Sequence, residues 1–228
     1  MQFYIVSPAT NTTETGSEYP QVQKMAPEYN YQAKNSVYAV SKTLDKIPDY
    51  KPNLDYFIVS EKAKLTDILS VSTIHGGFLI SPSYKKILEN FNLPLHKFFN
   101  ANVFYKQKFF KYYWLHIICD LTNNVDYSNS EFIAFYNYKH DLGTIKISTK
   151  EDFLQKKIEL KNNNPGKTIT IWAKKIAFKK VFNSNLDLFK IGMFDSNFYI
   201  TGKLKEKIYS EKITGCSILP ATNLFNSQ

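Results

Sequence analysis

The chain has 228 residues, 43% of them hydrophobic, which suits one globular domain with a large core or such a domain with an extension. No apolar run reaches the roughly 18 residues that span a membrane as a helix, and the opening MQFYIVSPAT lacks the basic start of a secretory signal. The net charge is +9, yet all 29 basic residues are lysine. Because arginine is best suited to bidentate reading of guanine and phosphate, this composition speaks against a dedicated nucleic-acid reader. We expect a cytoplasmic protein without a membrane span.

Residues 1–54 differ from the rest of the chain in charge and pattern. They contain five lysines and five acids, whereas residues 55–228 contain 24 lysines and 15 acids and carry the whole excess (24 − 15 = +9). Residues 2–6 predict a strand. Residues 9–32 are polar with two prolines, which predicts a long loop, and the composition leaves open whether this loop is ordered. We therefore expect an N-terminal strand and polar loop extension over residues 1–54 and a main domain over residues 55–228.

Residues 78–101 predict a strand–helix–strand unit. Ser81 can cap a helix that begins at Pro82, where a missing N–H costs nothing. The helix carries an apolar stripe at three- and four-residue spacing, made of Tyr84, Ile87, Leu88 and Phe91. The unit returns without a gap over residues 198–221, with Thr201 as the cap and a separation of 198 − 78 = 120 residues. These matches predict an internal repeat in which each helix packs its stripe on a sheet.

The remaining pattern is mainly strand. Residues 109–119 are apolar on both faces, which predicts a central strand, paired in a hairpin with residues 101–105 around the turn at 106–108. Residues 168–178 predict a strand whose apolar parity slips near two consecutive lysines and so indicates a bulge. Residues 150–161 predict a helix. Shorter segments indicate strand at residues 55–60, 132–136 and 144–148, strand or short helix at 37–44, and a turn of helix at 66–69, while residues 187–191 lead into the second repeat unit. The expected fold class is α+β, a strand-rich single domain with few helices and two similar strand–helix–strand units.

No catalytic template fits this sequence. The stretch Gly166-Lys167-Thr168 imitates the end of a phosphate-binding loop, but Lys161 stands at the place of the leading glycine and a strand follows. His116 and Cys119 are three residues apart on a predicted strand, so they point to opposite faces and cannot form a nucleophile–base pair. Cys119 and Cys216 fit no metal or disulfide framework. We expect no enzyme activity and no catalytic, cofactor-binding or metal-binding residues; an enzyme with an unrecognised site is a further alternative.

Several short segments within residues 55–221 match one known family. They are Ile80-Ser81-Pro82 with the helix that follows, Tyr112-Tyr113-Trp114-Leu115, Val125-Asp126-Tyr127 with Ser130, Asp187-Leu188-Phe189-Lys190, and the closing helix at residues 200–215. In these segments the chain resembles the bacterial immunity proteins of immunity family eleven, formerly a domain of unknown function, which occur beside polymorphic toxins. The family has no catalytic motif to transfer. The resemblance implies a cytoplasmic binding protein that sequesters and neutralises a cognate toxin made by its own lineage.

The charge suggests which toxin surface such a protein would prefer. Complementary fields speed encounter, so a basic immunity protein suits a toxin with an acidic surface. Turns and bulges project side chains from a rigid sheet, and we therefore expect lysines at the predicted hairpin turn and bulge to contact the partner, with nearby aromatic residues as anchors if they are exposed. These residues are Lys106, Lys108, Lys174, Lys175, Lys179, Lys180, Tyr105, Tyr112 and Trp172. The alternative function is a nucleic-acid-binding module that uses lysines and aromatic stacking, and the alternative role of the lysines is solubility.

Overall fold

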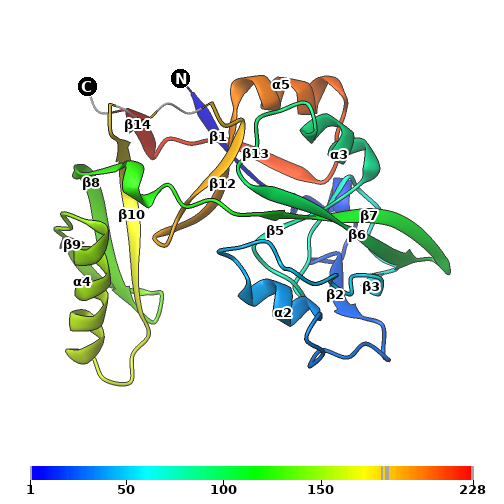
Figure 1. Ribbon diagram of the computed structural model, residues 1–228, viewed down its shortest axis with the longest axis horizontal. Coiled ribbons are helices and arrows are strands. Elements are labelled where there is room, and N and C mark those ends of the chain that lie inside the picture. The colour runs from blue at the N-terminus through cyan, green and yellow to red at the C-terminus, as the bar shows by residue number, and fades with distance from the viewer. Residues whose placement is uncertain (1, 181, 183–184, 227–228) are drawn as a thin grey trace. The chain divides into compact units, whose positions relative to one another are not determined.

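The computed structural model describes residues 2–180, 182 and 185–226. Within these residues the strands outweigh the helices and form three sheets (Figure 1). The predicted fold class, α+β with much strand and few helices, is confirmed. The chain divides into two compact units. Unit 1 comprises Met1–Cys119, Leu186–Phe189 and Tyr199–Leu219, and unit 2 comprises Asp120–Asn185, Lys190–Phe198 and Pro220–Gln228.

Unit 1 contains a six-stranded sheet in the order β2-β3-β6-β7-β5-β4. Its longest pair is the antiparallel hairpin of β6 (His96–Tyr105) and β7 (Lys108–Ile117). Trp114 and Leu115 follow each other on β7, so they point to opposite faces, and both are fully buried. The expected central strand is therefore confirmed between β6 and β5, and both of its faces are covered from Trp114 to Ile117, whereas its start at Lys108–Lys111 is mostly exposed. The other members of this sheet are β2 (Val22–Met25), β3 (Phe57–Val59), β4 (Ile68–Leu69) and β5 (Gly77–Ile80).

The second sheet has the order β11-β12-β1-β13. Its strands are β1 (Phe3–Pro8), β11 (Leu188–Gly192), β12 (Asp195–Thr201) and β13 (Cys216–Pro220). Helix α3 (Pro82–Leu88) leads from β5 to β6, and helix α5 (Gly202–Ser210) leads from β12 to β13. Both predicted strand–helix–strand units are therefore confirmed. Helix α3 ends at Leu88 rather than at Phe91, because Pro94 and the turn before it do not continue the helix.

The two repeats use the same helix cap. The hydroxyl of Ser81 accepts a hydrogen bond from the backbone N–H three residues later at 3.2 Å, and the hydroxyl of Thr201 does the same at 3.4 Å. Each hydroxyl in turn donates to an aspartate fourteen residues upstream, Ser81 to Asp67 at 2.6 Å and Thr201 to Asp187 at 2.8 Å. Because 187 − 67 = 120, the repeat begins further upstream than the sequence pattern indicates, and it includes β4 and β11.

Each aspartate also binds the loop that follows the other repeat's helix. The carboxylate of Asp67 accepts from the N–H of Thr214 at 3.0 Å and from its hydroxyl at 2.8 Å, after α5. The carboxylate of Asp187 accepts from the N–H of Asn92 at 3.0 Å, after α3. All four residues belong to unit 1. This crossed pair of contacts, which we call the aspartate clasp, ties the repeats to each other, and α3 and α5 lie side by side (Figure 1).

Strand β1 holds the place in the second repeat that β7 holds in the first. The order β4-β5-β7-β6 matches the order β11-β12-β1-β13 strand for strand. The N–H of Ile118, just after β7, donates to the carbonyl of Leu95 at 2.8 Å, and the N–H of Ala9, just after β1, donates to the carbonyl of Gly215 at 2.9 Å. The two acceptors are again 215 − 95 = 120 residues apart. The N-terminal strand thus completes a motif whose other parts come from the C-terminal third of the chain.

Side-chain contacts give the same correspondence. The ammonium group of Lys85 lies 5.1 Å from the centre of the Tyr113 ring, and that of Lys205 lies 4.1 Å from the centre of the Tyr4 ring. Tyr113 and Tyr4 differ by 109 residues, which is also the offset between Ile118 and Ala9 (113 − 4 and 118 − 9). The backbone contact and the side-chain contact therefore match residues of β1 with residues of β7 at the same offset.

Unit 2 contains a sheet in the order β14-β10-β8-β9, with helix α4 against β10 (Figure 1). Its elements are η1 (Thr122–Asn124), β8 (Val125–Tyr136), β9 (His140–Ile145), α4 (Lys150–Asn162), β10 (Ile169–Phe178) and β14 (Leu224–Asn226). Phe194 lies at the centre of its core, with ring centres of Tyr127, Phe132 and Phe153 between 5.3 and 6.1 Å away. The predicted helix and the predicted strand at residues 168–178 are both confirmed.

Three sequence predictions need correction or completion. Residues 66–69 are not a turn of helix, because Ile68 and Leu69 pair with β5 as strand β4. Residues 9–32 are not a plain loop, since they contain α1 (Thr12–Thr15) and β2, and buried Gln21 donates to the carbonyl of Lys64 at 2.6 Å. Residues 37–44 contain helix α2 (Val37–Lys42), whose two valines join the core cluster of unit 1. The division of the chain at residue 54 stays a prediction.

We predict that Ile87→Ala and Ile208→Ala each lower the free energy of unfolding by about 2–5 kcal/mol, because both side chains are buried and each substitution leaves a cavity. Chemical denaturation measures the loss. Lys86→Ala and Glu206→Ala, at exposed positions on the same two helices, are the matched controls and should change it by less than about 0.5 kcal/mol. A loss below about 1 kcal/mol for either isoleucine would show that its helix packs on another face.

We also predict that Asp67→Ala and Asp187→Ala each cost about 1–3 kcal/mol, since each removes one side of the aspartate clasp and leaves a cap hydroxyl and a loop N–H without their acceptor. Asp45→Ala, at an exposed position, is the control. Denaturant titration of the three variants decides the matter. If the two clasp variants unfold at the same denaturant concentration as the control, the clasp does not hold the repeats together.

Candidate partner-binding surfaces

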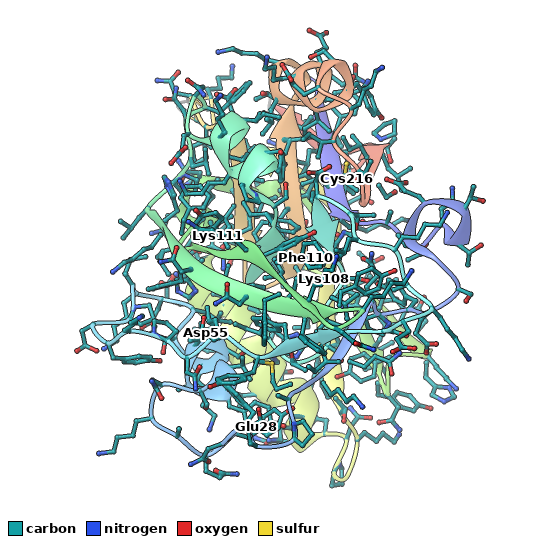
Figure 2. The ribbon with its side chains drawn as sticks, turned by 90° about the vertical axis from the view of Figure 1, so that its right-hand side faces the viewer. Glu28, Asp55, Lys108, Phe110, Lys111 and Cys216 are labelled. Carbon is teal, nitrogen blue, oxygen red and sulfur yellow. The ribbon has the colours of Figure 1, made fainter. Side chains whose placement is uncertain are left out.

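The hairpin turn of unit 1 carries the first group of predicted contact residues. Lys106 and Gln107 occupy its two central positions with φ of 46° and 63°, the left-handed pair that a two-residue hairpin turn requires. Lys106 and Lys108 are exposed, and Figure 2 shows Lys108 on β7 together with Lys111. Tyr105 is half-buried instead, because its hydroxyl donates to the carbonyl of Ala63 at 2.8 Å. The turn therefore presents lysines, while Tyr105 holds it against the unit.

Tyr112 cannot serve as a surface anchor. Its side chain is buried and its hydroxyl donates to the carbonyl of Thr66 at 2.7 Å, and this burial raises its pKa. The exposed aromatic residue of this hairpin is Phe109, with 68% of its surface accessible, packed 5.0 Å from the ring of Phe104. Since the run FFKYYW places aromatic residues on both faces of β7, the sequence alone could not tell which of them faces solvent.

The predicted bulge in β10 is confirmed and carries the second group. The pairing of β10 with β8 shifts register between Ala173 and Lys175 and again between Lys175 and Ala177. Lys174, Lys175, Lys179 and Lys180 are all exposed. The ammonium group of Lys175 lies 4.6 Å from the centre of the Phe225 ring, and that of Lys179 donates to the carbonyl of Asn123 at 2.9 Å. Two of the four lysines are thus oriented by neighbours within unit 2.

Trp172 lies just before the bulge and is 46% exposed, with its ring 5.0 Å from that of Phe135. It borders a groove in unit 2 with a volume of about 560 Å³. Thr168 and the start of β10 as far as Ala173 form one side of the groove, and residues 193–197, in the turn after β11 and the start of β12, form another. The remaining lining residues are Tyr138, Phe153, Lys157 and Asn223. Tyr138 and Met193 on this groove are also exposed, and neither was predicted from the sequence.

The two predicted groups belong to different units. Tyr105, Lys106, Lys108 and buried Tyr112 lie in unit 1, whereas Trp172 and the four bulge lysines lie in unit 2. Each group is therefore described as a candidate surface of its own unit. Of the predicted aromatic anchors, Trp172 is the one with a largely exposed ring.

The cysteines and histidines do not assemble a reactive centre within the described ranges. His116 is buried on β7, 3.1 Å from the carbonyl of Lys46, and Cys119 follows after the strand has ended. Burial raises the pKa of the Cys216 thiol to about 11, so it is protonated at neutral pH and a poor nucleophile. Neither cysteine forms a disulfide. Among the residues that the structure describes, no group of three or more His, Cys, Asp or Glu side chains could hold a metal ion.

The described part of the chain also contains no helix that is both long enough and apolar enough to cross a membrane. A search of curated proteins finds no match to this sequence. The model of one protein family, described as the immunity protein family Imm11, matches residues 2–223, nearly the whole length. This match includes the N-terminal strand that the sequence resemblance left out, in keeping with the place of β1 in the second repeat. The chain belongs to the immunity protein family Imm11.

Proposed function

We propose that this protein binds a cognate bacterial toxin in the cytoplasm and neutralises it by protein–protein interaction, without catalysis. The family match over residues 2–223 carries the proposal, since members of this family are described as immunity proteins. A toxin that is produced in the same cell must be blocked before it meets its target, and a stable complex achieves this without any reaction. Exposed lysines on a rigid turn and a rigid bulge support a recognition role.

The charge of the chain supports a toxin with an acidic surface. The net charge is +9, and opposite charges on two partners raise the rate at which they meet. Lys174 and Lys175 lie beside Trp172, so a steering charge and an aromatic anchor are neighbours on one strand. The hairpin turn offers a second combination, in which Lys106 and Lys108 lie next to exposed Phe109.

We predict that co-expression of this chain with the toxin domain encoded by the adjacent gene restores growth of a sensitive bacterial strain. The two proteins should purify together, and protection should require stoichiometric amounts of the chain, because binding rather than turnover blocks the toxin. Mass spectrometry of the recovered toxin should show an unmodified protein. An unrelated immunity protein is the control. Protection at far below stoichiometric amounts, with a cleaved or modified toxin, would instead identify an enzyme.

Charge reversal tests the two candidate surfaces. We predict that Lys174→Glu with Lys175→Glu slows association with the toxin by about 3- to 10-fold at low salt, through loss of electrostatic steering, and that the difference shrinks at moderate salt because ions screen exposed charges. Lys106→Glu with Lys108→Glu tests the hairpin turn in the same way. Stopped-flow or biosensor kinetics give the rates.

The matched control changes the net charge equally at exposed positions outside both surfaces, as Lys34→Glu with Lys42→Glu. Equal slowing by all three variants would mean that only net charge matters. Unchanged association for both surface variants, with the fold intact by circular dichroism, would remove these lysines from the interface.

A further inference from the structure

One edge of the sheet in unit 2 is only partly covered. Strand β10 pairs with β8 along one side over its whole length, from Ile169 to Phe178. On its other side β14 pairs with residues 176–178 alone. Within the described part of the chain, no strand pairs with residues 169–173 on that side. This five-residue segment, about 17 Å long at about 3.4 Å per residue, is a strand edge without a partner strand, on which Ala173 alone donates its N–H to a neighbouring turn, at Phe194.

The backbone groups of this edge point into the groove. Thr168 exchanges hydrogen bonds with Asn137, which follows β8, so the N–H and C=O of Thr168 face β8. In an extended strand these groups alternate in direction, and those of Ile169 and Ile171 therefore face away from β8. Ala173 confirms the alternation, because its N–H reaches the carbonyl of Phe194 at 3.4 Å on the groove side. The groove thus lies along a row of peptide groups that face away from the sheet.

Side chains beside this edge suit a second strand. Ile169 and Ile171 are buried, and Phe153 and Phe194 also line the groove, so one face of an added strand would meet apolar groups. The opposite face of the edge carries Thr170 and exposed Trp172. One face of an added strand would therefore contact apolar side chains, and its other face would lie beside Trp172.

Residues 169–173 lack the usual protection of a strand edge, which β10 carries only from its bulge and from Lys174 and Lys175 onward. Exposed edge strands usually carry lysine, proline or a bulge, which prevents pairing with other chains. Strand β9, at the opposite edge of the same sheet, carries His140 and Asp141 and a register shift. Residues 168–173 read TITIWA, without a charge, a proline or a glycine, in a chain with 29 lysines. Such a segment is prone to pair with another strand unless a partner covers it.

We propose that the open edge of β10 binds an extended strand of the toxin. This strand would pair with residues 169–173, on the same side of β10 as β14. Only another backbone matches a row of alternating N–H and C=O groups, and this mode is common in peptide recognition. The chain's own C-terminal strand does not fill the place, because β14 runs parallel to β10 from Leu224 at Ile176 to Asn226 at Phe178, away from residue 171. The toxin strand should bear apolar residues at alternate positions and an acidic residue where it passes Lys174 or Lys175.

This inference rests on the proposed function, and its test separates the two. The protein, labelled with ¹⁵N, is mixed with the toxin domain of the adjacent gene in a catalytically inactive form, and amide exchange is followed residue by residue. We expect the amides of Ile169 and Ile171 to exchange rapidly in the free protein and to slow at least about tenfold in the complex. The amides of Thr170 and Trp172, which face β8, should be protected in both states.

A pair of proline variants tests the same point through affinity. Ile171→Pro removes an N–H that faces the groove and leaves the pairing with β8 intact, and we expect about tenfold or weaker binding because a buried acceptor on the toxin loses its donor. Thr144→Pro is the matched control. Thr144 lies opposite Ile133, whose peptide groups face β10, so the N–H of Thr144 points away from the same sheet at its other edge.

The outcomes are distinct. Slowed exchange at Ile169 and Ile171, with weak binding of Ile171→Pro alone, supports the proposal, and the exchange result decides if that variant does not fold. A complex that leaves both amides exposed refutes strand addition while the immunity function stands. Absence of any complex overturns the proposed function and this inference with it. Protection that appears in the free protein as its concentration rises, together with dimers in sedimentation, would assign the edge to a second copy of the chain.

Discussion

The aspartate clasp is the contact on which the arrangement of unit 1 depends. Asp67 and Asp187 each receive a helix-cap hydroxyl from their own repeat and a backbone N–H from the loop of the other. A carboxylate can accept several hydrogen bonds at once, so a single side chain fixes where a helix starts and where the opposite loop ends. Helices α3 and α5, the entry strands β5 and β12 and the two exit strands are all attached to these caps. The two aspartates thus determine how the repeats align with each other, and the apolar stripes of α3 and α5 fill the space between the helices and the sheets.

Much of this fold can be predicted from local pattern. Caps such as Ser81-Pro82 and Thr201, the spacing of apolar residues on α3 and α5 and the parity slip in β10 depend on near neighbours, and each was interpreted correctly. The predicted secondary structure was wrong where pairing with a distant strand determines the conformation of a segment. Strand β4 has two residues whose conformation comes from pairing with β5, and β2 lies in a polar segment that pairs with β3. The equivalence of β1 and β7 is not visible in the 120-residue repeat, because their residues correspond at an offset of 109 and in the opposite order along the chain.

The positions of the candidate surfaces could be predicted from the sequence, but the aromatic side chains exposed on them could not. Turn and bulge residues project outward because of backbone geometry, which explains why the lysines are exposed as expected. Aromatic residues follow no such rule along β7, whose start is open on one face, so Tyr112 does not meet the condition of exposure and Phe109 is the exposed ring. The open edge of β10 could not be found from sequence at all. Its existence depends on the short reach of β14, a strand separated from it by more than forty residues.

The use of β1 in the second repeat has a consequence for how the protein is made. On the ribosome β1 emerges first, but its neighbours β12 and β13 are synthesised last. At about 5–20 residues per second, roughly 10–40 s separate the first strand from its sheet. During that time the strands of the first repeat, within residues 66–118, have all been made, while the second repeat still lacks β12 and β13. A protein of this design reaches its final form only when translation of the C-terminal repeat is finished, so a lag separates the start of its synthesis from the closed second sheet.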